Sequence, residues 1–172
     1  MPDSSRDPAV QALLDRTEIS DLVYRYAMGA SEGDTAMLLS IFSPDIRLDY
    51  YKGSPGHKEI HGIEAVTAYF QESPATSEKN PMGFDRHFSS SPLIANIMID
   101  LHGDEAHAES RGLVVHHGER GGRELFVMRS LSYSDDVVRL EEGWRIRVRS
   151  HPHAVWMMEL DNKDPRGILP VP

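Results

Sequence analysis

The amino-acid sequence predicts an α+β fold, in which helices from the first half of the chain pack on a curved antiparallel sheet built mainly from the second half. Apolar residues recur at helical spacing through much of the first 72 residues. From residue 86 onward the pattern alternates with a period of two, as in half-buried strands. Helices that precede strands in this order indicate an α+β domain, and strands of this length must twist and curl.

Three helices are expected in the first half of the chain. The first covers residues 7–31, and Asp34 caps a second helix at residues 35–42, which Pro44 ends. The third helix is expected at residues 63–72. Each of them carries apolar side chains on one face, so all three should pack on the sheet.

Alternating residues predict one strand at 45–51 and four longer strands after it. The turn sequences between the longer strands are short, which implies an antiparallel meander. Residues 73–83 are rich in Pro and Ser and should form a loop long enough to act as a lid or to be mobile. We expect one domain over residues 1–160 and an extended tail over residues 161–172. The longer strands are expected at residues 86–101, 105–117, 123–138 and 144–157.

Charge and composition exclude several classes of partner. The chain has 172 residues, with 18 Lys and Arg against 27 Asp and Glu, a net charge of -9. An acidic surface repels nucleic acid and anionic membranes, so we expect neither as a partner. There is no Cys, which excludes disulfides and thiolate metal sites. No apolar run approaches the roughly 18 residues of a membrane helix, so the expected location is cytoplasmic.

Three segments of the chain are informative when taken together. They are residues 16–27 (RTEISDLVYRYA) followed by Gly33-Asp34 and 38–45, residues 86–92 (RHFSSSP) leading into 103–106, and residues 143–146 (GWRI). In this order they resemble the SnoaL-like families of the nuclear transport factor superfamily. The layout is most similar to the group of scytalone dehydratase, hexachlorocyclohexane dehydrochlorinase and bile acid 7α-dehydratase. The resemblance covers roughly residues 10–158 and implies a cone-shaped barrel that encloses one pocket. It is weak for the reaction, because this fold carries many functions.

The resemblance implies a catalytic His at His87, on the strand that follows the loop at residues 73–83. In the lyase members this His pairs with an Asp, and the position of that Asp corresponds to Ser31 here. A Ser cannot orient an imidazole or stabilise an imidazolium as a carboxylate does. Three alternatives follow: Glu32 or Asp34 supplies the carboxylate, His87 works alone, or the chemistry of the pair is lost.

Other positions of the chain match pocket residues of the same families. By position, Tyr26 and Tyr50 correspond to pocket tyrosines of the dehydratases, and His116 corresponds to a second pocket His. Arg149 lies near the position of a pocket Arg in the dehydrochlorinase. The expected catalytic set is therefore His87, Tyr50, Tyr26 and His116, and the expected substrate-binding set is Ser31, Arg149, Tyr133 and Glu32.

The residue types alone suit proton abstraction beside a carbonyl group. Such a reaction needs a base whose pKa is near neutral, and His is the natural candidate. The developing enolate needs hydrogen-bond donors, which Tyr hydroxyls or an Arg can supply. Strand alternation places His87 on the face of Ser89. The same alternation places His116 on the face of Gly112 and Ser110, small residues that leave room for a ligand.

Each of these residues also has a plain structural interpretation. His87 can be a satisfied core histidine, and the tyrosines can be packing residues with their hydroxyls at the rim of the core. Arg145, Arg147 and Arg149 alternate along one predicted strand, a pattern that is typical of a solvated face.

The nine His residues do not form a recognisable metal-binding motif. His57 and His61 are four residues apart, but they lie in a turn and a short strand, where we do not expect this spacing to place both on one face. There is no HExxH sequence and no Gly-rich phosphate loop. We therefore expect no metal and no cofactor.

The sequence favours a cofactor-independent, dehydratase-like lyase or isomerase that uses His-centred acid/base chemistry. The expected substrate is a small hydrophobic carbonyl compound such as a polyketide, a terpenoid or a steroid-like molecule. Two alternatives stay open: a non-catalytic protein that binds a hydrophobic ligand, and a structural subunit resembling the β subunit of ring-hydroxylating dioxygenases. A homo-oligomer, either a dimer or a trimer, is expected in each case. Trp156, Met157 and Met158 are candidate contact residues, because one face of a curled sheet often stays apolar.

Overall fold

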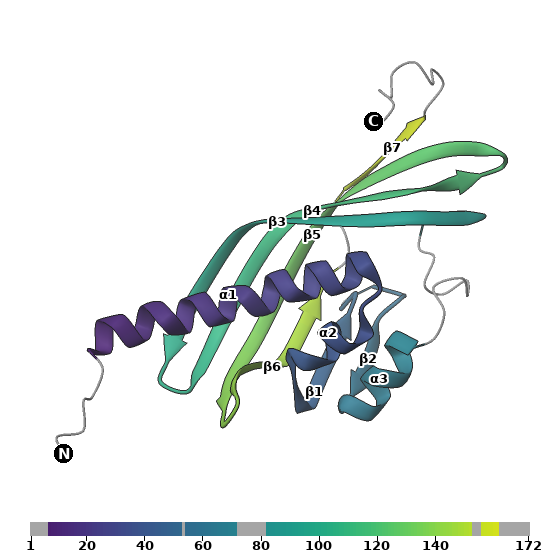
Figure 1. Cartoon of the computed structure of the whole chain (residues 1–172). Coiled ribbons are helices and arrows are strands. Elements are labelled where there is room, and N and C mark those ends of the chain that lie inside the picture. The colour runs from purple at the N-terminus through teal and green to yellow at the C-terminus, as the bar shows by residue number, and fades with distance from the viewer. Residues whose placement is uncertain (1–6, 53, 72–81, 153–155, 162–172) are drawn as a thin grey trace.

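The computed structural model of the protein describes residues 7–52, 54–71, 82–152 and 156–161. The helices are α1 (Pro8–Glu32), α2 (Thr35–Ser40) and α3 (Ile63–Gln71). The strands are β1 (Phe42–Tyr50), β2 (Lys58–His61), β3 (Arg86–His102), β4 (Glu105–Arg120), β5 (Arg123–Leu140), β6 (Gly143–His151) and β7 (Met157–Asp161). Three helices packed on one curved sheet confirm the predicted α+β class (Figure 1).

The sheet is mixed and open. Its strand order is β2-β1-β6-β5-β4-β3, and β7 pairs with β5 outside this path. Every pair is antiparallel except β1 with β6, which is parallel. The expectation of an all-antiparallel sheet was therefore wrong at this pair, because the chain returns to β1 only after crossing the whole meander, and no hairpin sets the direction. Since β2 and β3 have free edges in this path, the described sheet is not a closed barrel.

The second helix is shorter than predicted. It ends at Ser40, and β1 begins at Phe42, so Pro44 lies inside a strand and does not stop the helix. The pairing of β1 with β6 is irregular between Phe42 and Arg47. A Pro is tolerated at such a place because no ladder hydrogen bond requires its missing N–H.

The last predicted strand, residues 144–157, consists of two strands. β6 ends at His151 and is followed by Pro152, which cannot donate a ladder hydrogen bond. β6 pairs with residues 134–140 of β5, whereas β7 pairs with residues 125–129. The predicted lid at 73–83 and the predicted tail at 161–172 lie almost wholly outside the described residues.

The helix ends follow the sequence signals. The Asp7 carboxylate accepts a hydrogen bond from the backbone N–H of Ala9 at 2.8 Å, and Gly33 closes α1 with a φ of 69°. Asp34 caps α2 as predicted, because its Oδ1 accepts from the N–H of Met37 at 2.9 Å. Gly29 lies inside α1, and a Cβ there would meet Cγ of Leu38 at 3.0 Å, so its small size lets α2 pack against α1.

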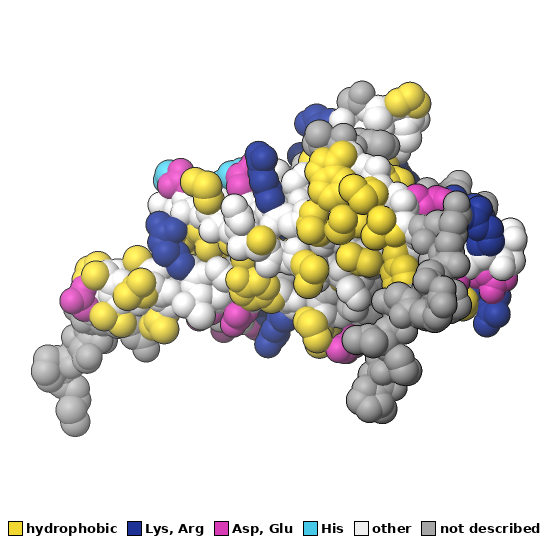
Figure 2. Space-filling model, turned by 90° about the horizontal axis from the view of Figure 1, so that it is seen from above, with side chains coloured by type: hydrophobic (Ala, Val, Ile, Leu, Met, Phe, Trp, Pro, Cys, Tyr) yellow, Lys and Arg dark blue, Asp and Glu magenta, His cyan; other side chains and the backbone are white. Residues whose placement is uncertain are grey.

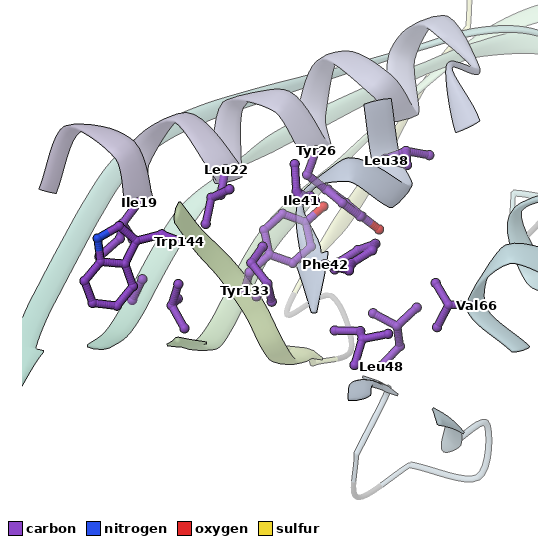
Figure 3. Close-up of a cluster of buried hydrophobic side chains, with 14 of the residues drawn as sticks. Ile19, Leu22, Tyr26, Leu38, Ile41, Phe42, Leu48, Val66, Tyr133 and Trp144 are labelled. Atoms are coloured by element: carbon purple, nitrogen blue, oxygen red, sulfur yellow. The ribbon is translucent and has the colours of Figure 1, made fainter. Parts of the chain in front are cut away.

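The core lies between the helices and one face of the sheet (Figure 3). α1 runs across the strands and buries Ile19, Leu22 and Tyr26 against them (Figure 1). Trp144 is only 1% exposed, and its Nε1–H donates to Asp15 Oδ1 at 3.2 Å. It is therefore a core residue. The hydrogen bond from Arg139 is the largest influence that lowers the pKa of Asp15, to about 2.

Large apolar side chains remain exposed on part of the surface. Figure 2 shows hydrophobic side chains gathered near the middle of the face seen from above. The residues of β7 and its flank, Trp156, Met157 and Met158, are 41% to 52% exposed in the single chain. Self-association through them stays a prediction. Within the described part of the chain, no helix has the length and apolar character that a membrane span requires.

Candidate functional site

Five polar side chains from four strands form a continuous chain of contacts, which we call the imidazole relay. His87 Nε2 lies 3.0 Å from Ser90 Oγ, and Ser90 Oγ lies 2.8 Å from Nδ1 of His116. Arg129 Nε donates to Nε2 of His116 at 3.3 Å. Arg129 Nη1 lies 3.5 Å from Nε2 of His151. His87 is at the exposed end of the relay, while His116, Arg129 and His151 are buried.

A bulge in β3 brings the first two members of the relay together. His87 pairs with Gly118 and Ser89 pairs with His117, so β3 carries one extra residue here. Side chains after the bulge change faces, and Ser90, not Ser89, shares the face of His87. The predicted face of His87 was therefore wrong. Ser90 is paired directly with His116 across β3 and β4, which explains their short contact.

The relay has one hydrogen-bond direction when the imidazoles are neutral. An Arg can only donate, so Nε2 of His116 accepts from Arg129 and its Nδ1 carries the proton. That Nδ1–H donates to Ser90 Oγ. The single hydroxyl hydrogen of Ser90 then donates to Nε2 of His87, because a Ser has one donor and can accept at the same time.

Two of the three imidazoles of the relay, those of His87 and His116, are held toward the neutral form. Burial, more than any other cause, lowers the pKa of His87, and a hydrogen bond with the backbone of Ser89 partly opposes this effect. Burial also lowers the pKa of His116 to about 4, and the charges of Arg129 and His87 add to the effect. At neutral pH His87 is therefore neutral, and its Nε2, which accepts the Ser90 hydroxyl hydrogen, can take a proton once that hydrogen turns away.

No described carboxylate takes the place of the missing Asp. Ser31 Oγ donates to the backbone carbonyl of Ser90 at 2.7 Å and thus supports the relay from α1. Asp34 is engaged as the cap of α2, and Glu32 is exposed at the end of α1. No described carboxylate lies within 4.0 Å of a ring nitrogen of His87, so the alternative in which Asp34 or Glu32 completes the pair is not supported.

The three tyrosines that the sequence singled out, Tyr26, Tyr50 and Tyr133, lie in contact with one another through Tyr26. The hydroxyls of Tyr26 and Tyr50 lie 3.4 Å apart, and the rings of Tyr26 and Tyr133 pack edge to face at 5.3 Å. His151 connects them to the relay, since its ring centre lies 5.8 Å from Tyr50 and 5.1 Å from Tyr133. Burial is the largest cause that raises the pKa of Tyr50 and of Tyr133, so both hydroxyls stay protonated at neutral pH.

Arg149 is fully buried, so its interpretation as part of a solvated face was wrong. Its guanidinium donates twice to Asp135, at 2.8 and 2.6 Å, and lies 4.1 Å from the ring of Tyr26 and 4.4 Å from that of Tyr133. Burial alone would lower its pKa, but the charge and hydrogen bonds of Asp135 outweigh burial and raise it. Nη1 of Arg149 has no hydrogen-bond partner among the described residues.

A second bulge turns Arg149 inward. Asp136 pairs with Val148 and Val137 pairs with Ile146, so Arg147 is an extra residue on β6. Side chains beyond the bulge change faces, and for this reason Arg149 does not follow the outward Arg145.

The small residues beside His116 do not leave space for a ligand as predicted. A Cβ on Gly112 would lie 1.9 Å from the carbonyl oxygen of Leu93, so the backbone of β3 fills this space. Ser110 is buried on the same face as predicted, and its hydroxyl has no described hydrogen-bond partner. The enclosed pocket itself stays a prediction.

The sequence did not single out Ser90, Arg129 or Asp135. Arg129 could have been predicted from the sequence, because it lies between Val127 and Leu131 on the inward-facing side of β5. A polar residue at such a position of an alternating strand indicates a buried polar contact. Ser90 gave no such signal, because the bulge at Phe88 is not visible in the pattern of β3.

A separate His and carboxylate cluster lies at the junction of β1 and β2. Asp49, His57 and Glu59 each place one possible ligand atom within 4.8 Å of the others. The expectation that His57 and His61 would not share a face was wrong. Both ring Nε2 atoms approach Glu59, at 3.7 and 3.1 Å, because a spacing of four along extended chain returns a side chain to the same face.

Comparisons with known proteins agree with this architecture. The family model described as a SnoaL-like domain matches residues 11–150. Among curated protein sequences, none matches the chain. Hexachlorocyclohexane dehydrochlorinase LinA-type3 from Novosphingobium barchaimii superposes with a TM-score of 0.69 at 16% identity, over 95% of this chain and 99% of that one.

Two structures from Novosphingobium aromaticivorans are similar as well. A proposed scytalone dehydratase superposes with a TM-score of 0.68 at 16% identity, over 87% of this chain and 90% of that one. A protein described as NTF2-like with a cystatin-like fold gives 0.66 at 22% identity, over 88% and 90%. At these identities the likeness concerns the fold alone.

Proposed function

Because the chain belongs to the family of SnoaL-like domain proteins, we propose that it is a cofactor-independent lyase or isomerase of the dehydratase type. We further propose that His87 performs the acid/base chemistry on a small hydrophobic carbonyl compound. The observation that carries this proposal is the imidazole relay, which presents a neutral His at its exposed end with buried donors behind it. A general base of this kind works best when its pKa lies near the working pH.

In the proposed elimination, Nε2 of His87 removes a proton from the carbon beside the substrate carbonyl. The new N–H then points at Ser90 Oγ, which already accepts from Nδ1 of His116. The hydroxyl hydrogen of Ser90 must turn away from His87, and it can donate to the departing oxygen. The C–H electron pair forms the double bond while the C–O bond breaks. Hydroxide leaves as water after it takes the proton from His87.

The tyrosine hydroxyls are proposed to hold the carbonyl oxygen. Tyr50 and Tyr26 meet at 3.4 Å, and the raised pKa of Tyr50 keeps its hydroxyl protonated as a hydrogen-bond donor. Two such donors stabilise the negative charge that develops on an enolate oxygen. Three residues of the expected substrate-binding set are proposed to position other residues. Tyr133 and Arg149 contact the ring of Tyr26 and hold it in place. Ser31 holds the backbone of Ser90 through a hydrogen bond to its carbonyl.

The charge balance of the core favours an uncharged substrate. The buried guanidinium of Arg149 is already neutralised by Asp135, so it does not need a substrate anion. Phe42, Phe70 and Tyr26 pack ring against ring beside the tyrosine hydroxyls, an environment that suits apolar carbon skeletons. Polyketide, terpenoid and steroid-like ketones satisfy both conditions.

The test uses the full chain and a panel of small cyclic β-hydroxy ketones, with enone absorbance reporting elimination and NMR in D2O reporting exchange of the protons beside the carbonyl. The wild type should turn over or exchange at least one compound. His87→Ala should lose at least about 100-fold of the rate, the typical contribution of a general base. His102→Ala, at the far exposed end of β3, is the matched control and should retain the rate. Equal rates in wild type and His87→Ala would overturn the mechanism.

A non-catalytic protein that binds hydrophobic ligands is the second candidate. It is favoured by one observation, that no described carboxylate lies within 4.0 Å of His87 to stabilise its imidazolium. The same panel separates the two functions. Saturable quenching of Tyr and Trp fluorescence, without elimination or proton exchange for any bound compound, would favour binding over catalysis.

A further inference from the structure

Two carboxylates converge on one imidazole nitrogen at the edge of the sheet. Nε2 of His57 lies 2.8 Å from Oδ1 of Asp49 and 3.7 Å from Oε1 of Glu59. The single proton that Nε2 can carry is shared with one oxygen at a time, so it leaves the other carboxylate without a hydrogen bond from this ring. A cation at the same point would contact all three atoms.

The backbone holds this arrangement in place. Asp49 and Glu59 are directly opposite each other in the β1–β2 ladder. His57 precedes Glu59 by two residues, so both side chains emerge on one face. On the other side of Glu59, Nε2 of His61 lies 3.1 Å from Oε2, where it holds the carboxylate in position. A ligand carboxylate that is itself held by a neighbouring group is typical of metal sites.

Asp49 supplies independent evidence for a missing partner. Its side chain is 0% exposed, and its Oδ2 has no hydrogen-bond partner among the described residues. The ammonium of Lys52 is 3.8 Å away, outside hydrogen-bonding distance, and 70% exposed. Burial of a carboxylate whose Oδ2 has no partner is costly, and a cation bound by the same carboxylate lowers that cost by neutralising its charge.

We propose that Asp49, His57 and Glu59 form a binding site for one Zn²⁺ ion. Zinc bonds His nitrogen and carboxylate oxygen at about 2.0–2.2 Å, which separates neighbouring ligand atoms in a tetrahedral site by about 3.4 Å. The two separations from Nε2 of His57, 2.8 and 3.7 Å, lie on either side of that value, and the ligand oxygens of Asp49 and Glu59 lie within 4.8 Å of each other. Small rotations of exposed side chains therefore complete the geometry. The fourth position is left to water or to an external ligand, and the ion would fasten β2 to β1.

A second cluster of one His and two carboxylates, at His107, lacks a common point at which all three ligand atoms could bind one ion. His107 also contacts two carboxylates, but Asp136 lies at its Nδ1, at 2.8 Å, and Glu109 at its Nε2, at 3.2 Å. The two carboxylates sit on opposite sides of the ring, and one ion cannot reach both with the imidazole. His107 therefore provides a matched control.

The test is isothermal titration calorimetry of the untagged full chain with Zn²⁺ alone at pH 7.5. The wild type should bind one Zn²⁺ per chain. His57→Ala and Glu59→Gln, both on exposed side chains, should each weaken binding by at least about tenfold. His107→Ala should bind as the wild type does. Lys52→Met removes a competing positive charge and should tighten binding.

Three results would overturn the site: no zinc binding by the wild type, binding that survives His57→Ala unchanged, or binding lost in His107→Ala and kept in His57→Ala. Circular dichroism of each variant checks that the fold is retained. The proposal does not depend on the chemistry at His87, since none of its three ligands belongs to the imidazole relay.

Discussion

Breaking the buried ion pair between Asp135 and Arg149 should be among the most destabilising single changes in the protein. The side chains are 1% and 0% exposed and are joined by two short hydrogen bonds. Asp135→Asn keeps the shape of the side chain and removes its charge, which leaves the guanidinium buried without a counter-ion. Removal of one partner from such a pair typically costs about 3–5 kcal/mol.

The surroundings of Arg149 place the expected loss at the lower end of that range. In Asp135→Asn, the Arg149 guanidinium still has its cation–π contacts with the rings of Tyr26 and Tyr133. Such contacts between desolvated groups are worth about 2 kcal/mol. We therefore expect Asp135→Asn to lower the free energy of unfolding by about 3 kcal/mol. Arg149→Met should cost at least as much, because it leaves a buried carboxylate with no aromatic face to stabilise it.

Urea denaturation followed by circular dichroism measures these losses. The double variant Asp135→Asn/Arg149→Met should cost clearly less than the sum of the two single variants, because each single change already breaks the same pair. Arg147→Met is the control. Its ion pair with Glu105 is exposed, and such pairs contribute about 0–1 kcal/mol. The reasoning is refuted if Asp135→Asn is no more destabilising than Arg147→Met.

Three further outcomes are expected. Catalysis by His87 should fall as the pH drops through its pKa, which burial holds below 6.5. A pH–rate profile whose half-maximal point lies above pH 6.5 would contradict this. The free energy of unfolding should decrease as the pH falls from about 6.5 to 4. The reason is that His116 has a pKa of about 4 in the folded protein, so the unfolded chain takes up the proton first. Urea titrations at several pH values, compared with His116→Phe, measure this effect. Gly112→Ala should lower the free energy of unfolding by about 1–3 kcal/mol or more, because its Cβ would lie 1.9 Å from the carbonyl oxygen of Leu93. An unchanged denaturation midpoint would show that β3 and β4 can move apart at this point without cost.

The elements of the fold could be predicted because their signals are local. Helical spacing and the cap at Asp34 gave α1 and α2, and alternation with short turns gave the meander from β3 to β6. The parallel pairing of β1 with β6 could not be predicted in this way, because it joins segments about 100 residues apart. The alternation of apolar and polar residues within a strand gives no information about which distant strand it pairs with.

The candidate site was predicted in its residue types more than in its contacts. Tyr26 and Tyr50 are buried, as their interpretation as packing residues implied, and His116 and Tyr133 are buried as well. The roles of Ser31 and Arg149 were not predictable, since one bonds the backbone of Ser90 and the other neutralises Asp135. A hydrogen-bond partner on another strand depends on register, and register depends on bulges that composition does not reveal.

The bulges also explain how this chain combines a polar site with an ordinary alternating pattern. Without the extra residue between His87 and Ser89, Ser90 would face away from His116, and the relay would lose its central hydroxyl. Without the extra residue on β6, Arg149 would point outward with Arg147. Each bulge thus turns one polar side chain inward while the flanking strand keeps its apolar face on the core. Bulges are frequent beside active sites for this reason. One bulge serves the part-buried contact of Ser90 with His116 and the other serves the buried pair of Asp135 and Arg149, and an apolar core would have needed neither.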